Sequence, residues 1–287
     1  MVLEWLNGVI TDEKIPIGKY AKRSVDWLID NGGFVFDWLS VQLKAMIDAL
    51  LWLLELPHPL LAIGLLVGLA WWLKRNIGFP IFVAFSLLLI LNQGYWEEML
   101  QTLSLVVSAA IVCMAVGVPL GIMAAHNPKF SAFLRPVLDL MQTIPTFVYL
   151  IPALILFGLG MVPGLIATVI FAIPAPVRLT ELGVKSVPNQ LIEAGKAFGA
   201  TKRQLLWKVE LPYAIPNIMA GLTQTIMLSL SMVVIAALVG APGLGVPVVR
   251  ALNTVNIAKG FEAGLVIVLV AILLDRFLRY ERGKDHG

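Results

Sequence analysis

The sequence contains very little cysteine and little charge. A single cysteine, Cys113, occurs among 287 residues, so the chain can form no internal disulfide and no zinc cluster built on several thiolates. Charged residues make up 14% of the chain and hydrophobic residues 59%, whereas soluble domains contain about 25% charged and about 45–50% apolar residues. A soluble fold of this length could not bury so much apolar surface. The composition therefore predicts an integral membrane protein.

The sequence also lacks the motifs of a membrane-embedded enzyme or of an ATPase. Its three histidines, His58, His126 and His286, lie far apart, and neither H-E-x-x-H nor G-x4-G-K-[ST] occurs. We therefore predict no catalytic, cofactor-binding or metal-binding residue on this chain, and any ATP and Mg²⁺ that drive it are expected on a partner subunit. The centres of the apolar runs contain no obvious ionisable residue. This argues against a proton-coupled carrier, because ionisable groups at membrane depth are costly and usually functional.

Long apolar runs, in contrast, are abundant. An α-helix needs about 20 apolar residues to cross a hydrocarbon core about 30 Å thick. The candidate spans are 58–73, 77–92, 99–125, 136–158, 161–179, 214–240 and 262–279. The sequence thus predicts an all-α, polytopic bundle of about seven membrane-spanning helices, in which the first two spans are short.

The basic residues predict how this bundle is oriented. With the N-terminus outside, 14 of the 21 Lys and Arg residues fall on the inner side, and the opposite orientation leaves seven there. Because cytoplasmic segments are enriched in Lys and Arg, we expect the N-terminus outside and the C-terminus inside.

A different kind of helix is expected before the first span. From Phe34 to Glu55, the polar residues Asp37, Lys44 and Asp48 fall on the same side as Glu55 at 100° per residue. Apolar residues occupy much of the remaining circumference. This pattern predicts an amphipathic helix that lies along the outer membrane surface or against the bundle.

The segment 180–213 is the only substantial soluble stretch between spans, and its pattern predicts two short helices. We expect Asn189 to cap the first helix and Gly199 to end it with a left-handed backbone. The second helix should run from about Thr201 to Glu210, with Pro212 ending it. Such a helix–turn–helix suits docking onto a cytosolic partner, and the alternative is a plain connecting loop.

This segment resembles a loop of a known transporter family. It reads Glu193-Ala194-Gly195, three residues, Gly199, nine residues, then Val209-Glu210-Leu211-Pro212, which is similar to the E-A-A-x3-G-x9-I-x-L-P loop of permeases in binding-protein-dependent ABC importers. Gly195 departs from the pattern, which has Ala. The stretches 138–150 and 230–236 resemble permeases for glycine betaine, proline betaine and choline, and 240–245 is most similar to choline permeases.

The resemblance implies a fold, partners and a function. It implies a permease core whose two copies pair about a pathway in the bacterial inner membrane, in contact with lipid and not with nucleic acid. An external binding protein would deliver a quaternary ammonium compound, and each cytoplasmic loop would contact one ATPase subunit. The coupling-loop residues would be Glu193, Ala194, Gly195, Gly199, Leu211 and Pro212. The alternative function is a secondary transporter or channel that works without an ATPase.

The sequence pattern and this resemblance together predict how the chain is divided. Residues 1–57 form an external amphipathic segment and 58–95 two N-terminal spans particular to the family. The permease core covers 96–280, with its cytoplasmic coupling loop at 180–213, and 281–287 form a cytoplasmic tail.

Two polar stretches within the spans are candidates for lining a pathway. The candidate residues are Gln142, Thr146, Tyr149, Gln224, Ser229 and Ser231. A quaternary ammonium has no N–H donor, so aromatic faces such as that of Tyr149 suit it. The alternative role for these residues is hydrogen bonding between helices.

A glycine-rich loop follows the sixth span. Gly240, Pro242, Gly243 and Gly245 permit an irregular, compact turn. We expect this loop on the outer side, either as an outer gate that contacts the binding protein or as a simple turn.

Overall fold

The computed structural model describes residues 16–278, and these residues form helices and connecting turns without any strand. This confirms the all-α prediction. The first 15 residues of the predicted external segment and the predicted tail 281–287 lie outside the described residues. The helices are α2 Ile17–Glu55, α3 Pro59–Lys74, α4 Gly78–Asn92, α5 Trp96–His126, α6 Pro128–Thr143, α7 Thr146–Phe157, α8 Met161–Ala172, α9 Pro174–Lys185, α10 Asn189–Ala197, α11 Lys202–Leu205, the π-helix η1 Leu206–Glu210, α12 Leu211–Ala237, α13 Gly245–Asn253 and α14 Ile257–Leu278.

The described helices supply four to six candidate spans, compared with about seven predicted. Among the described residues, four helical stretches are long and apolar enough to cross a membrane, and up to six if each of two bent helix pairs counts as one span. The predicted span 77–92 corresponds to α4, which has 15 residues. At 1.5 Å per residue this helix is only about 22 Å long, too short for a hydrocarbon core about 30 Å thick.

The predicted span 136–158 is not one straight helix. It divides into α6 and α7, whose axes differ by 94°. Ile144 between them is extended, with φ −64° and ψ 129°, because a residue before proline avoids the helical region. Pro145 itself has no N–H to continue the helix. The polar residues predicted in this span therefore lie on both sides of a sharp bend.

Glycines allow α5, α9 and α12 to pack closely at the centre of the molecule. A Cβ on Gly121 of α5 would lie 2.6 Å from the carbonyl oxygen of Val177 in α9, and one on Gly221 of α12 would lie 3.1 Å from the Cα of Pro176. A Cβ on Gly183 of α9 would lie 2.9 Å from Asn217 of α12. Small residues at helix interfaces are typical of membrane bundles, where close backbone approach supplies much of the packing energy.

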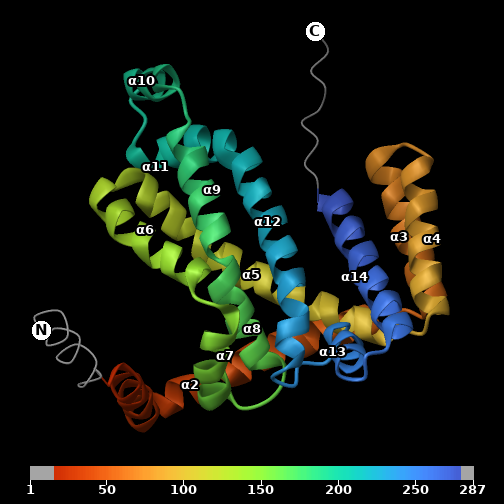
Figure 1. Cartoon of the computed structure of the whole chain (residues 1–287). Helices are drawn as coiled ribbons and strands as arrows, with labels where there is room; N and C mark the ends of the chain where they lie inside the picture. Colours follow the sequence, from red (N-terminus) through yellow and green to blue (C-terminus); the bar gives the residue numbers. More distant parts are fainter. Residues whose placement is uncertain (1–15, 279–287) are drawn as a thin grey trace, which may run out of the picture.

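The segments that connect the long helices lie at two opposite ends of the bundle (Figure 1). α10 and α11 lie at one end, together with the α3–α4 connection and the C-terminal end of α14. α13 lies at the other end, where α2 runs across the bundle, and α2 and α3 differ in direction by 91°. Ile47 of α2 is fully buried, and its carbonyl oxygen accepts a hydrogen bond of 2.7 Å from the Ser104 hydroxyl of α5. The amphipathic helix therefore packs against the bundle.

Candidate functional site

The residues from 186 to 212 form a compact helical projection at the α10 end, which we call the elbow. Its first helix, α10, ends as the sequence predicts, because Gly199 has φ +74° and its N–H donates to the Lys196 carbonyl. The Ala200 N–H bonds back to the Gly195 carbonyl at 3.1 Å, which closes a left-handed helix ending. The predicted cap is wrong. Asn189 is the first helical residue, and Pro188 occupies the cap position without a side-chain hydrogen bond.

Gly195 lies where α10 packs against the second helix of the elbow. A Cβ at this position would lie 2.8 Å from Cδ2 of Leu205 and 3.9 Å from Cγ2 of Val209. Leu205 is buried, so an apolar side of the second helix faces α10. Residue 195, which is Gly here and Ala in the family pattern, therefore lies at a packed contact between the two helices.

The second helix of the elbow does not end at Pro212. It begins at Thr201, which forms a reciprocal capping box with Gln204, and continues through η1 into α12, so that Lys202–Ala237 is one helical stretch of 36 residues. The Leu211 N–H bonds to the Leu206 carbonyl, five residues back. This π-turn offsets the hydrogen-bond pattern just before Pro212, which has no N–H to donate. The elbow is therefore joined directly to a membrane span.

The elbow exposes apolar side chains that nothing in the described chain covers. Phe198 is 93% exposed and Leu191 45% exposed. Ala194, Ala197 and Glu193 of the same helix are also exposed. Phe198 is thus almost fully accessible at the end of α10.

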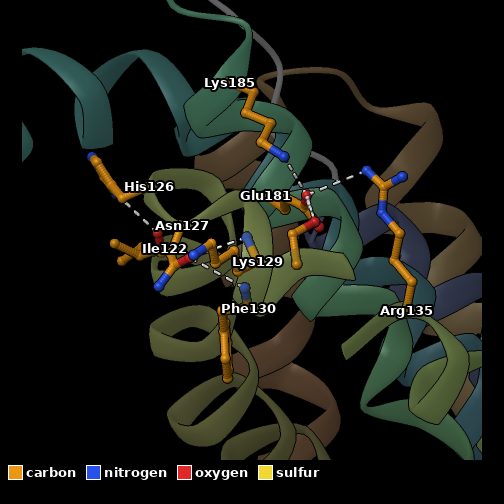
Figure 2. A network of polar contacts seen from close by, with 9 residues as sticks. Ile122, His126, Asn127, Lys129, Phe130, Arg135, Glu181 and Lys185 are labelled. Carbon is orange, nitrogen blue, oxygen red and sulfur yellow. Dashed lines mark hydrogen bonds and ion pairs between the residues drawn. The ribbon is translucent and has the colours of Figure 1, made fainter. Parts of the chain in front are cut away.

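A buried carboxylate joins two helices, α6 and α9, next to the elbow. Glu181 of α9 is 7% exposed, and its Oε1 accepts hydrogen bonds from the Ser131 hydroxyl of α6 at 2.7 Å and from Lys185 at 2.5 Å. Arg135 of α6 lies 3.5 Å from the same oxygen. Figure 2 shows Lys185 and Arg135 converging on Glu181 from different elements. Sequence reasoning missed this role, because Ser131 and Arg135 are about 50 residues from Glu181.

The connection between α5 and α6 contacts the elbow directly. The Asn127 side chain caps α6 by accepting from the N–H groups of Lys129 and Phe130. Beside it, Nε2 of His126 lies 2.8 Å from Oε2 of Glu210, which is in η1. Nδ1 of His126 lies 2.9 Å from the Ile122 carbonyl oxygen. These contacts link the α5–α6 connection to η1.

The predicted pathway residues do not form one cluster. Gln142 accepts a hydrogen bond of 3.2 Å from Arg178 of α9, which also pairs with Asp139. Tyr149 is 8% exposed and packs with Met232 of α12 in one apolar cluster. Its hydroxyl has no hydrogen-bond partner among the described residues. Thr146 is half-buried at the start of α7.

On α12, the hydroxyl of Ser229 bonds to the carbonyl of Thr225 and that of Ser231 to the carbonyl of Met227. These bonds lie within one helix, not between helices as the alternative supposed. Gln224 and Ser231 are exposed on the surface of the chain.

The glycine-rich loop is fixed to α5. The Leu244 N–H donates to Oγ1 of Thr102 at 2.9 Å, and a Cβ on Gly243 would lie 2.6 Å from that oxygen. A Cβ on Gly245 would lie 2.3 Å from the Val233 carbonyl oxygen. Gly240 has φ +85°, and Pro242 is exposed. Packing explains the two buried glycines, and a role as a gate stays a prediction.

Several apolar helices long enough to cross a membrane, packed in one all-helical bundle, define a multi-pass membrane protein. The chain belongs to the family described as "Binding-protein-dependent transport system inner membrane component", whose model matches residues 117–280, more than half of the chain. Membership implies an ATPase and a substrate-binding protein as partners.

Individual relatives agree with this assignment. The chain is 47% identical over 263 residues to the glycine betaine transport system permease protein OpuAB of Bacillus subtilis, covering 92% of this chain and 93% of the relative. It is 42% identical over 272 residues to the glycine betaine/proline betaine permease ProW of Escherichia coli, covering 94% of this chain and 76% of ProW. The fold is similar to that of the MetNI methionine ABC transporter in inward-facing conformations, with TM-score 0.56 and 24% identity over 62% of this chain and 92% of that chain.

Proposed function

We propose that this permease carries a quaternary ammonium compound across the bacterial inner membrane, and that glycine betaine is its first candidate substrate. The observation that carries the proposal is the 47% identity to a glycine betaine permease along nearly the whole of both chains. The names of other relatives include proline betaine and carnitine. Choline, which the sequence favoured, appears in the name of a relative of 34% identity, together with glycine betaine and carnitine.

The elbow is the proposed contact with the ATPase. Its exposed apolar tip suits a groove on a partner, and η1 connects it without interruption to α12. ATP and Mg²⁺ would bind to that partner. Closure of the ATPases would move the elbow and shift the bundle between inward-open and outward-open states. Glu193, Ala194, Gly195 and Gly199 would form the contact helix, and Leu211 with Pro212 would connect it to the span.

We propose that a second copy of the permease packs over the exposed polar side chains of α12. Gln224 has no side-chain hydrogen bond among the described residues and is exposed, as is Ser231. Polar side chains at membrane depth usually face protein or a water-filled cavity, because lipid offers them no partner. A pathway between two copies would give both residues polar surroundings.

Uptake measurements test this function. In cells without other betaine uptake, radiolabelled glycine betaine should accumulate only when the permease, its ATPase and its binding protein are produced together. Excess unlabelled proline betaine and choline would rank the substrates. Accumulation without the ATPase would instead support a secondary transporter or channel.

A further inference from the structure

A cleft lined by both charged and apolar residues opens at the end of the bundle opposite the elbow. Its volume is about 580 Å³, and its walls come from the start of α5, the glycine-rich loop, α13 and the start of α14. Pockets for small molecules typically measure about 300–1,000 Å³. The cleft is therefore large enough for a small solute, and in the orientation that the sequence predicts it faces outward, the side from which an external binding protein would deliver one.

Charges of both signs line this cleft. Tyr95 and Glu98 contribute from α5 and the residue before it, Arg250 from α13 and Lys259 from α14. Within residues 16–278, the charged groups of Glu98, Arg250 and Lys259 form no ion pair and no hydrogen bond. Unpaired charges of opposite sign in one cleft are available to a ligand that also carries both signs.

The aromatic part of the cleft is also its anionic part. Burial, followed by the nearby carboxylates of Glu262 and Glu98, raises the pKa of Tyr95 above its usual value. The phenol ring thus stays neutral and lies within reach of two negative charges. A quaternary ammonium, which cannot donate a hydrogen bond, is attracted by such carboxylates and by an aromatic face.

Hydrogen bonds within the chain support the part of the cleft that carries the basic residues. The Thr254 hydroxyl bonds to the carbonyl of Arg250 at 2.9 Å, and the Asn256 N–H bonds to the carbonyl of Ala251 at 2.9 Å. The Asn256 side chain accepts from the N–H of Lys259 at 3.1 Å. Hydrogen bonds within the chain therefore hold the turn that joins the two helices carrying Arg250 and Lys259, and a supported site of this kind favours ligand binding.

We infer that this cleft is a low-affinity vestibule for a small zwitterion, in which Glu98 and Tyr95 bind a quaternary ammonium group and Arg250 and Lys259 bind a carboxylate. This inference rests on the proposed function for its substrate class. An acidic loop of a docking protein fits less well, because Glu98 would repel it. A simple cation is opposed by Arg250 and Lys259.

Ligand binding to the purified chain in lipid nanodiscs tests the inference. Saturation-transfer NMR would follow glycine betaine, which has a carboxylate, and choline, which has none. Arg250→Gln and Lys259→Gln should each weaken glycine betaine binding about tenfold, as expected for the loss of a charge-assisted hydrogen bond. The same variants should leave choline binding within about twofold or strengthen it, since they remove only cations. Glu98→Gln should weaken the binding of both compounds.

Two charges outside the cleft serve as matched controls. Glu97 is adjacent to Glu98 and exposed, and Lys44 is exposed on α2; Glu97→Gln and Lys44→Gln should bind both compounds as the unmodified chain does. The inference is overturned if the unmodified chain shows no saturable binding of glycine betaine. It is equally overturned if Arg250→Gln weakens choline as much as glycine betaine, which would indicate a structural or protein-docking role. Uptake by the complete importer, measured in parallel, shows whether the proposed function stands when the vestibule does not.

Discussion

Among single residues, Glu181 makes the densest set of polar contacts in the described chain near the elbow. Its carboxylate accepts from Ser131 and Lys185 and pairs with Arg135, so it ties α6 to α9. We expect Glu181→Ala to destabilise the protein by about 2 kcal/mol, as the loss of buried hydrogen bonds to charged groups typically does. The midpoint of thermal unfolding in detergent would measure this change.

Glu193 provides the comparison, because it is exposed on α10. Glu193→Lys should leave the unfolding midpoint unchanged and abolish uptake if the elbow contacts the ATPase. An equal loss of stability in both variants would contradict the structural role assigned to Glu181.

Gly195 allows a second prediction for a single residue. The atom nearest to an added Cβ is the flexible end of Leu205, so Gly195→Ala should be accommodated by a small side-chain movement. The helix should gain up to about 1 kcal/mol from the better propensity of Ala. Uptake close to the unmodified level and an unfolding midpoint that does not fall would confirm this. Gly195→Phe, which requires the helices to separate, is the variant expected to lose uptake.

At the scale of elements, the turn between the two helices of the elbow depends on Gly199. Its φ of +74° costs an ordinary L-residue about 1–2 kcal/mol, whereas Asn visits this region readily. Gly199→Val should therefore reduce uptake strongly, and Gly199→Asn should retain most of it. Uptake rates normalised to the amount of permease in the membrane would show the difference, and equal rates for the two variants would refute it.

The close packing of α5 against α9 depends on Gly121, because no space remains there for a side chain. An added Cβ would lie 2.6 Å from both the Val177 carbonyl oxygen and Cβ of Thr180, and backbone atoms cannot move aside cheaply. We expect Gly121→Ala to lower stability by about 1–3 kcal/mol, the usual cost of overpacking.

The control for this variant is Gly68→Ala in α3, where an added Cβ meets nothing within 4 Å. Thermal unfolding should distinguish the two substitutions. Equal unfolding midpoints would show that the helices can separate without cost at Gly121.

At the scale of the whole molecule, the fold makes a prediction about the two membrane sides. Phe198 at the elbow is 93% exposed, and Val255 at the α13–α14 turn is 83% exposed, and they lie at opposite ends of the bundle (Figure 1). The native Cys113 is buried, so Cys113→Ala gives a suitable background. A membrane-impermeant maleimide should label Val255→Cys in intact cells and Phe198→Cys only in inverted vesicles. The ATPase should protect Phe198→Cys. The reverse labelling would show that the predicted orientation is wrong.

Much of the secondary structure could be predicted because it depends on local sequence. Apolar run length indicated the long helices, and Gly199 indicated a left-handed helix ending. The predictions of helix ends at prolines failed where two local preferences of the backbone competed. Pro212 stays within a helix because a π-turn precedes it, whereas Pro145 does break its span because Ile144 becomes extended.

The sequence by itself determined that this chain is a helical membrane protein, which family it resembles and where its elbow lies, because hydrophobicity, proline and glycine act on the adjacent backbone. Only the tertiary structure decided which polar groups meet. Glu181 with Arg135, His126 with Glu210, and Glu98 with Arg250 in one cleft come from segments far apart in the chain. Their approach depends on how α5, α6, α9 and α12 pack, and that packing is a property of surfaces in three dimensions rather than of spacing along the sequence.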